Sequence, residues 1–318
     1  TKHKAVSNQE KVWGAIGGLA NSLGDPYTYF MPPQEKSLFE QDVRGSFGGV
    51  GMQIGVKDGV LTVIAPLKGS PAERAGILKG DKIYRIDSAT TTNMDVDKAL
   101  YLIRGEVGKA VHLTLIREGA KAPIEVSVVR EVIAVPTIDT EKKGDVFVIH
   151  LYGFPATGAD LFRNALREFV QSGSNKLVLD LRGNPGGFLE EAVQMGSFFL
   201  GAKTVAGIVE HGRKRSLKLN RKALYTGPLV VMIDDGSASA AEVLAGALKD
   251  HKRALVVGPS STYSKGTVQR LFPLGNELIL SDHGFDSNSG VAKLTTSLFY
   301  SPDGHSPENG GIRPDILL

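Results

Sequence analysis

The sequence contains no cysteine. Disulfide bridges, catalytic thiols, iron–sulfur clusters and zinc–thiolate sites are therefore excluded together. None of the seven histidines pairs with another at a metal-ligand spacing beside a carboxylate. His251, which follows Asp250, is expected to flank the end of a helix rather than to complete a Ser–His–Asp triad. We therefore predict no metal and no cofactor.

Long apolar runs and a large net charge are also missing. No apolar run approaches the roughly 18 residues that a membrane-spanning helix needs, and no signal peptide opens the chain. Because the chain starts at Thr1 rather than at methionine, we expect that a preceding segment was removed or left out. The 37 basic and 34 acidic residues leave a net charge of only +3, so we predict no nucleic-acid partner.

What is present is typical of a soluble globular protein. The 318 residues suggest two domains at roughly 150 residues each, and 42% of them are apolar and 22% charged. Glycine is enriched: 38 residues are about 12% of the chain, against a usual share of about 7%. We therefore expect many tight turns and close backbone approaches.

Three segments differ in their pattern, and we predict domains over residues 1–43, 44–131 and 132–318. In the first, apolar residues recur at helical spacing from Val12 to Leu23. A loop with several aromatic residues, Asp25–Met31, follows a Gly-Asp-Pro stop and is expected to anchor the segment to a neighbouring domain.

The second and third segments alternate between strands and helices. The second contains short strands, a hairpin over 111–129 and two helices. The third has apolar runs of four to six residues separated by amphipathic helices, which is typical of parallel βαβ units. The fold class is therefore α/β overall, or α+β as a multidomain chain.

Two glycine-rich turns of the third segment each lie between a buried strand and a helix. They are residues 183–187 and residues 236–240, the latter with the sequence Gly-Ser-Ala-Ser-Ala. Reactive groups of α/β proteins collect at such junctions, where helix amides point outward. A serine here can present its hydroxyl to a substrate, but Ser237 or Ser239 can equally serve as a helix cap.

A lysine between small residues follows the next strand, in the segment Tyr263–Gln269. A solvated lysine is a poor base at neutral pH, whereas a buried one can accept a proton. Ser239 and Lys265 could form a Ser–Lys dyad for acyl transfer, with Gln269 holding the amine. The alternative is that Lys265 is an ordinary surface lysine.

In this order the motifs resemble the C-terminal processing proteases, peptidase family S41. The resemblance rests on Ser-Ala-Ser-Ala-Ala-Glu at 237–242, Lys-Gly-Thr-Val-Gln at 265–269, Asp-Leu-Arg-Gly-Asn-Pro-Gly-Gly at 180–187 and Gly-Gly-Ile-Arg-Pro-Asp at 310–315. It extends over nearly the whole chain, and Asp-Pro-Tyr-Thr-Tyr-Phe at 25–30 is similar to an aromatic segment of the family. It implies a PDZ domain within 44–131 and a crotonase-like ββα core.

The resemblance also implies roles for individual residues. The nucleophile maps to Ser239, the base to Lys265 and its orienting partner to Gln269. The oxyanion donors map to the backbone amide of Ala240 and to a glycine of the 184–187 turn, Gly186 or Gly187. Asp250 corresponds to an acidic position that supports activity.

The sequence departs from the family pattern at three places. Ala241 replaces a third serine of the nucleophile motif, which should matter little if Ser239 is the nucleophile. The loop that carries Lys265 is one residue longer than usual. Ser264 stands where a glycine is usual, so we expect a strained backbone with positive φ there.

The PDZ-like segment is expected to capture the C-terminal carboxylate of a substrate. Phe47, Gly49, Val50, Gly51 and Met52 would form the amide-lined loop and its apolar pocket, and the peptide would add as a strand. The alternative is a purely structural hairpin. Arg104 is a candidate for linking the position of the PDZ domain to the dyad. The alternative is that Arg104 is a surface arginine with no role.

The resemblance thus predicts a serine endopeptidase that cleaves proteins with apolar C-terminal tails through an acyl-enzyme. It would work outside the cytoplasm, in the periplasm or at the cell envelope. An activating adaptor or peptide and a homo-oligomer are left open. Two other functions are considered: a catalytically impaired PDZ scaffold that only binds C-termini, and an acyl-CoA enzyme, because crotonase-type cores share the glycine-turn oxyanion hole.

Overall fold

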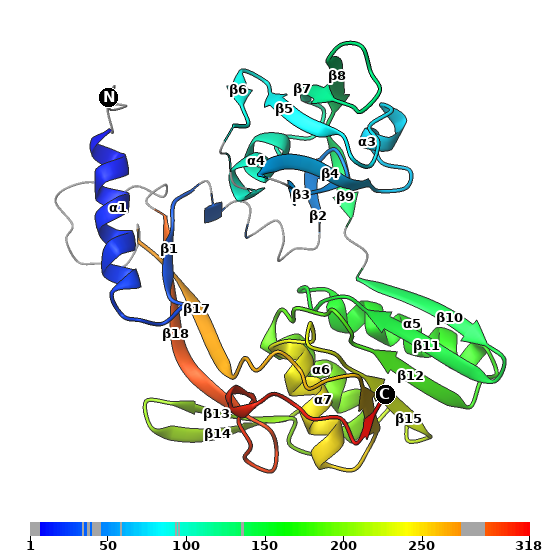
Figure 1. Ribbon diagram of the computed structural model, residues 1–318. Coiled ribbons are helices and arrows are strands. Elements are labelled where there is room, and N and C mark those ends of the chain that lie inside the picture. Colours follow the sequence, from blue (N-terminus) through cyan, green and yellow to red (C-terminus); the bar gives the residue numbers. More distant parts are fainter. Residues whose placement is uncertain are drawn as a thin grey trace. The chain divides into compact units, whose positions relative to one another are not determined.

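The computed structural model of the chain (Figure 1) describes residues 7–33, 35–36, 39, 46–57, 59–92, 94, 96–134, 137–274 and 290–318. It divides into two compact units. The core unit combines Thr1–Lys36 with Pro136–Leu318, and the inserted unit is Ser37–Val135. These units reflect packing alone, so the domain division at residues 43 and 131 stays a prediction. Each unit is described by itself.

The inserted unit is a small β-domain with two short helices. Its strands are β2 Ser46–Gly49, β3 Met52–Lys57, β4 Val60–Pro66, β5 Lys82–Ile86, β6 Ala89–Thr90, β7 Ala110–Ile116, β8 Ile124–Val129 and β9 Glu131–Ala134, and its helices are α3 Pro71–Arg74 and α4 Val96–Ile103. The main sheet has the order β3-β4-β5-β7-β8, with β6 paired to β5, while β2 pairs with β9. The predicted hairpin is confirmed as β7–β8.

The inserted unit has its own apolar core, built from alternate positions of the strands. Leu61, Val63, Ile83, Ile86 and Leu113 are all fully or almost fully buried. Helix α3 begins as its sequence predicts, because Ser70 accepts a hydrogen bond from the amide of Glu73 and Pro71 occupies the first turn.

The core unit contains a mostly parallel sheet with helices between its strands. The strands are β10 Ile138–Lys143, β11 Val146–Leu151, β12 Lys176–Asp180, β15 Leu229–Met232, β16 Leu255–Gly258 and β19 Ile316–Leu317, in that spatial order. Helices α5 Gly158–Gln171, α6 Leu189–Leu200 and α7 Ala240–Asp250 alternate with them. The predicted parallel βαβ units are confirmed for β11, β12, β15 and β16, whereas β10 is an antiparallel edge strand.

A second sheet of the core unit joins distant parts of the chain. Its strands are β1 Tyr29–Met31, β13 Ala206–Glu210, β14 Arg213–Leu217, β17 Thr267–Pro273 and β18 Val291–Tyr300. The order is β1-β18-β13-β14, and β17 also pairs with β18. In Figure 1 the long β18 runs beside both β1 and β17.

The N-terminal segment confirms one sequence prediction and corrects another. Helix α1, Asn8–Asn21, starts at a Ser7 capping box and ends before Gly24, where the pattern predicted a stop. Residues 29–31, predicted as part of a loop, form strand β1. The reason is tertiary: β18 offers an edge to which this segment adds with the register Tyr29↔Lys293.

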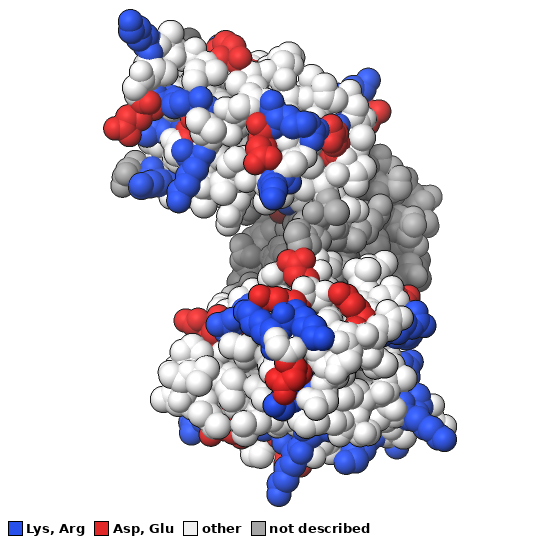
Figure 2. Space-filling view, turned by 90° about the vertical axis from the view of Figure 1, so that its right-hand side faces the viewer, with Lys and Arg blue, Asp and Glu red and all other residues white. Residues whose placement is uncertain are grey.

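Both units carry a mixed surface. On the face shown in Figure 2, basic and acidic side chains are interspersed among the described residues, in line with the small net charge. Among the described residues, no helix is long and apolar enough to cross a membrane.

Candidate active site

The serine turn, residues 236–240, connects β15 to α7. Ser237 is fully buried, and its hydroxyl donates to the carbonyl of Leu181 at 2.7 Å while accepting from the amide of Asp234 at 3.1 Å. Ser239 is half-buried and has a backbone conformation of φ 55° and ψ −114°, which is strained for any residue except glycine. The structure thus separates the two serines: Ser237 fastens the turn, and Ser239 occupies the strained position at the start of the helix.

The glycine turn, residues 183–187, follows β12 and lies directly against the serine turn. A Cβ atom on Gly186 would come within 2.8 Å of the Ser239 Cβ and 2.9 Å of the Ala240 amide nitrogen. The fully buried Asn184 holds the two turns together, because its carbonyl accepts from the amide of Ala238 at 2.9 Å. The two predicted junctions therefore form one site.

Two backbone amides at this junction are available to a ligand. Within the described ranges, the amides of Ala240 and Gly187 have no acceptor. The amide of Gly186, in contrast, donates to the side chain of Asn184 at 2.8 Å. Of the two glycines predicted as oxyanion donors, Gly187 therefore has the available amide. Gly186 lacks the Cβ atom that would collide with the serine turn.

The lysine loop, residues 258–266, is fastened to α7 by one carboxylate. Glu242 is 1% exposed. Its Oε2 accepts from the amides of Ser239 at 2.8 Å and Lys265 at 2.9 Å. Its Oε1 accepts from the Thr262 hydroxyl at 2.6 Å and the Ser264 amide at 2.9 Å. One buried side chain thus fixes the backbone on both sides of the candidate dyad.

Further backbone contacts close the lysine loop onto its surroundings. The amide of Tyr263 donates to the carbonyl of Ser237 at 2.9 Å. The hydroxyl of Thr262 accepts from the amide of Ile312 at 2.7 Å, which gives the Gly-Gly-Ile motif near residue 311 a structural role. Ser264 has φ 82°, so the strained backbone expected at this position is confirmed.

The amine of Lys265 lies in a partly desolvated pocket of charged and aromatic groups. Its Nζ is 4.6 Å from the centre of the Tyr27 ring. Burial lowers the pKa of Lys265, and the neighbouring Lys293 lowers it further, while Glu242 and Asp25 act in the opposite direction. In the part of the chain that is described, the amine makes no hydrogen bond or ion pair. Lys265 is therefore not an ordinary solvated lysine.

Gln269 is close to this pocket but is bonded elsewhere. Its amide nitrogen donates to the hydroxyls of Thr267 at 2.9 Å and Thr295 at 3.1 Å. Its predicted role as the partner of Lys265 stays a prediction. The structure does not bring Asp250 to the candidate dyad, since Asp250 lies at the opposite end of α7 from Ser239, about 16.5 Å along the helix at 1.5 Å per residue. There it accepts from the amide of Asp303.

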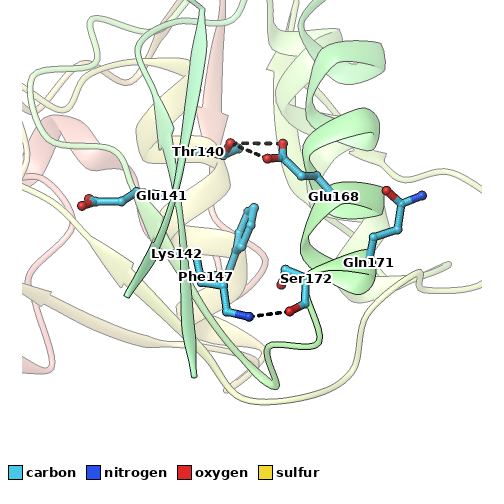
Figure 3. Close-up of a pocket in the computed structure, with 7 residues that line it drawn as sticks. All are labelled: Thr140, Glu141, Lys142, Phe147, Glu168, Gln171 and Ser172. Atoms are coloured by element: carbon cyan, nitrogen blue, oxygen red, sulfur yellow. Dashed lines mark hydrogen bonds between the residues drawn. The ribbon is translucent and has the colours of Figure 1, made fainter. Parts of the chain in front are cut away.

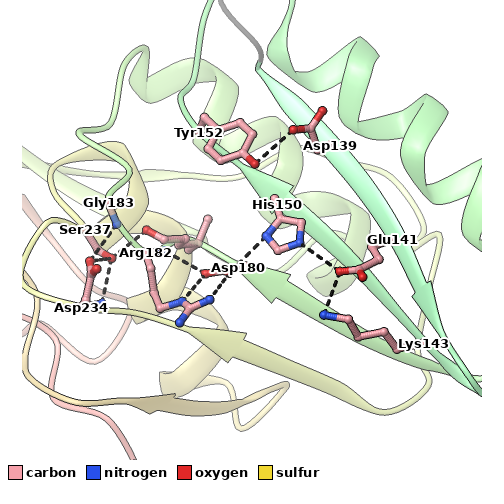
Figure 4. Close-up of polar contacts among 11 residues, drawn as sticks. Asp139, Glu141, Lys143, His150, Tyr152, Asp180, Arg182, Gly183, Asp234 and Ser237 are labelled. Atoms are coloured by element: carbon pink, nitrogen blue, oxygen red, sulfur yellow. Dashed lines mark hydrogen bonds and ion pairs between the residues drawn. The ribbon is translucent and has the colours of Figure 1, made fainter. Parts of the chain in front are cut away.

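A charged network surrounds the end of β12 next to the glycine turn (Figure 4). Arg182 donates to both oxygens of Asp180, at 2.9 and 2.7 Å, and His150 Nδ1 lies 3.2 Å from the same carboxylate. Burial raises the pKa of Asp180, but the Arg182 hydrogen bonds outweigh it and hold the pKa below its usual value. Asp234 fastens the neighbouring turn by accepting from the amide of Gly183 at 2.8 Å.

Sequence reasoning quoted Glu242, Asp180 and Arg182 only as parts of motifs and assigned them no role. A signal existed for each. Ser239 and Glu242 have the Ser-x-x-Glu spacing of a capping box. Asp180 and Arg182 come at the carboxyl end of a parallel strand, where functional groups of α/β sheets gather.

In the inserted unit the predicted carboxylate-binding loop joins β2 to β3. The Arg104 guanidinium lies 3.9 Å from the centre of the Phe47 ring. The amide of Gly105 donates to the carbonyl of Gly48 at 3.0 Å, so the loop packs against the end of α4. Gly51 has φ 72°, and a Cβ there would meet the side chain of Ser70 at 2.4 Å. Val50 is buried in the core, and β3, which starts at Met52, is an edge strand.

Two family profiles match parts of this chain. The profile of peptidase family S41 matches residues 145–318, and a PDZ-domain profile matches residues 62–117. The carboxy-terminal-processing protease of Bartonella bacilliformis is 33% identical over 329 residues, which cover the whole of this chain and 72% of that protein. The chain belongs to peptidase family S41.

Other S41 relatives support the assignment. Carboxy-terminal processing protease CtpA of Bacillus subtilis is 34% identical over 317 residues. The match covers 99% of this chain, which spans only 65% of that relative. Among solved structures, the photosystem II D1 C-terminal processing protease matches with a TM-score of 0.62 and 26% identity, over 100% of this chain and 84% of the other.

The predicted fold class is thus confirmed as a mixed α/β S41 chain with a PDZ domain. The inserted unit contains the PDZ match, and the core unit contains the S41 match. The crotonase-like description of the core stays a prediction.

A pocket of the S41 core lies away from the serine turn (Figure 3). It has a volume of about 360 Å³ between β10 and α5, with Phe147 in its wall. Two of its polar groups bond to other lining residues: Thr140 donates to Glu168 at 3.0 Å, and Lys142 donates to the Ser172 carbonyl at 2.5 Å. It contains no predicted site residue.

His251 was considered as a member of a Ser–His–Asp triad, with a position at the end of a helix as the expected alternative. His251 ends α7, as predicted, and its Nε2 lies 2.7 Å from the carbonyl of Thr204. Among the residues that the structure describes, no three His, Asp or Glu side chains are grouped to hold a metal ion.

Proposed function

We propose that this chain is a serine endopeptidase in which Ser239 is the nucleophile and Lys265 the general base. The observation that carries the proposal is Glu242, whose Oε2 accepts from the amides of both residues. The strained Ser239 backbone and the lowered pKa of Lys265 support it, because a base must be able to lose its proton near neutral pH.

We propose the following reaction. Neutral Lys265 takes the proton of the Ser239 hydroxyl as its oxygen attacks the scissile carbonyl carbon. The amides of Ala240 and Gly187 stabilise the oxyanion that forms. Lys265 returns the proton to the leaving amine, and an acyl-enzyme on Ser239 remains. Water then attacks the ester with Lys265 again as the base. Gln269, two residues beyond Thr267 on β17, would orient the amine.

The PDZ domain would select the substrate. We propose that residues 47–52 bind the C-terminal carboxylate and that an apolar tail adds to β3, which pairs only with β4 among the described strands. Both relatives quoted above are named as carboxy-terminal processing proteases, which fits tail selection. We further propose that the chain works outside the cytoplasm, and an activating adaptor or a homo-oligomer fits the same scheme.

A second candidate function, a scaffold that binds C-termini without cleaving them, is favoured only by the strained Ser264 in the lysine loop. No observation favours an acyl-CoA enzyme. The test of the main proposal is cleavage of an unfolded protein that ends in an apolar tail, by the wild type, Ser239→Ala and Lys265→Ala. We expect cleavage by the wild type alone. Tail binding without cleavage in all three would support the scaffold.

The protease and the scaffold also differ in whether a serine-reactive probe should label Ser239. A fluorophosphonate probe should label the wild type on Ser239, and Ser237→Ala should be labelled on the same residue, because the Ser237 hydroxyl is buried and bonded to Leu181. Labelling of Ser237 in the Ser239→Ala variant would contradict the assignment of the nucleophile.

A further inference from the structure

The aromatic loop before β1 lies at the dyad lysine, although more than two hundred residues of sequence separate them. The ring of Tyr27 faces the amine of Lys265, with 4.6 Å between Nζ and the ring centre. The proposed reaction assigns no role to this loop. The contact lies entirely within the core unit.

The loop is held firmly in this place. Asp25 accepts from the amide of Tyr27 at 3.0 Å and from the hydroxyl of Thr28 at 2.6 Å. The buried Thr28 in turn accepts from the amide of Thr295 at 3.0 Å. Thr295 is also the residue to which Gln269 donates. The same strand, β18, is therefore bonded both to the loop that carries Tyr27 and to Gln269.

We propose that Tyr27 is a positioning residue for Lys265: its ring face holds the amine, keeps water from that side of it, and stabilises the ammonium ion that forms when the amine takes a proton. The face of an aromatic ring attracts a cation, and more strongly where water is excluded. The part of the proposal that concerns proton transfer from Ser239 rests on the proposed function.

Other charged and titratable groups also face the amine. They are Asp25 on the same loop, Glu242 on α7 and Lys293 on β18. Tyr263 is a hydrogen-bond partner of Tyr27. Asp25 and Glu242 favour the ammonium ion, whereas Lys293 disfavours it. A test has to change the ring alone and leave these charges in place.

The test measures the pKa of Lys265 itself, by competitive acetylation with acetic anhydride across pH and mass spectrometry of the Lys265 peptide. Tyr27→Phe keeps the ring face and should leave the Lys265 pKa unchanged. Tyr27→Leu keeps an apolar cover but removes the ring face, so it should lower the pKa by about half a unit. Tyr27→Ala admits water and should raise the pKa instead.

Tyr152→Leu is the matched control, because Tyr152 is bonded to Asp139 and lies outside this pocket. It should leave the Lys265 pKa unchanged. A Lys265 pKa in Tyr27→Leu equal to that of the wild type would overturn the proposal. If Tyr27→Ala does not fold, the comparison of Tyr27→Phe with Tyr27→Leu decides alone.

Acetylation needs no turnover, so this result is independent of the proposed function. Cleavage is then measured on the same variants, with Lys265→Ala beside them. The expected shifts of pKa without any Lys265-dependent cleavage would leave the role of Tyr27 standing and contradict the proposed protease. Lys265-dependent cleavage with no change of the Lys265 pKa in Tyr27→Leu would support the proposed protease and contradict the role of Tyr27.

Discussion

The amides of Ser239 and Lys265 share one acceptor, Oε2 of Glu242. The serine turn and the lysine loop therefore cannot move apart without breaking a hydrogen bond to a buried carboxylate. Hydrogen bonds to charged groups are among the stronger ones in proteins, and a buried unpaired group is costly. The relative position of the two residues thus depends on a side chain that takes no part in proton transfer.

Glu242→Gln tests this arrangement with little change of shape. Each carboxylate oxygen of Glu242 accepts two hydrogen bonds, and the amide nitrogen of glutamine cannot accept any. We expect unfolding in urea to show a loss of about 1–3 kcal/mol, and fluorophosphonate labelling of Ser239 to slow by about 100-fold. The exposed Glu190→Gln is the control, and equal behaviour of the two variants would refute the role of Glu242.

Gly186→Ala should disrupt the site, because the new Cβ atom would collide with the serine turn. The new Cβ would lie 2.8 Å from the Cβ of Ser239 and 2.7 Å from the carbonyl oxygen of Ala238, and Gly186 has φ 98°. Gly183→Ala is the matched control, since Gly183 also has positive φ, 67°, but has open space around it. We expect both variants to lose about 1–2 kcal/mol of stability, and only Gly186→Ala to lose labelling. Normal labelling of Gly186→Ala would show that the turns can separate.

The pH dependence of cleavage should report on Lys265. Since its pKa lies below the ordinary value of 10.5, the neutral base becomes populated, and kcat/KM rises, at a lower pH than for a solvated lysine. Lys265→Arg should be inactive at every pH, because arginine stays protonated. Lys176→Arg, on an exposed pair with Asp145, serves as the control and should keep the wild-type profile. Cleavage by Lys265→Arg would identify another base.

The Asp180–Arg182 pair should contribute to stability in a pH-dependent way. A carboxyl whose pKa is lowered in the folded state stabilises the fold above its unfolded pKa, and this contribution disappears as the pH falls through the folded value. Arg182→Leu should therefore lower the free energy of unfolding by about 1.5–3 kcal/mol at neutral pH, with a smaller difference once the pH has fallen through the lowered pKa of Asp180. Lys176→Leu breaks an exposed pair and should cost much less.

Arg104 should affect tail binding through its contact with Phe47. Loss of a cation–π contact of about 0.5–2 kcal/mol corresponds to roughly 2- to 30-fold weaker binding. We expect this loss for Arg104→Ala in fluorescence anisotropy with a peptide that ends in an apolar residue. The same peptide with a C-terminal amide is the control. If peptide-stimulated cleavage by Arg104→Ala equals that of the wild type, the regulatory role of Arg104 is wrong.

The elements that sequence analysis predicted well are those with a local signal. Strands β12 and β15 are short apolar runs that end in glycine-rich turns, so both their position and the junctions after them could be inferred. Local patterns contain this information because it concerns adjacent residues. The strain at Ser264 was expected only from the resemblance to the S41 family, in which a glycine is usual at this position.

What could not be predicted depends on pairs that are distant in sequence. Residues 29–31 become a strand only because β18 lies beside them, and three of the four hydrogen bonds of Glu242 reach a loop that begins after another strand. The difference between Gly186 and Gly187 as amide donors depends on the side chain of Asn184. Composition and periodicity contain no information on such contacts.

The hydrogen bond from Ile312 to Thr262 has a consequence for synthesis on the ribosome. Tyr27 and the PDZ domain are made early, and Ser239 and Lys265 follow, but the contact that closes the lysine loop needs residue 312. The ribosome adds about 5–20 residues per second, so Lys265 is made before Ile312. The lysine loop can form its hydrogen bond to Ile312 only after residue 312 has left the ribosome. Under the proposed function, a nascent chain would therefore bind tails before it could cut them.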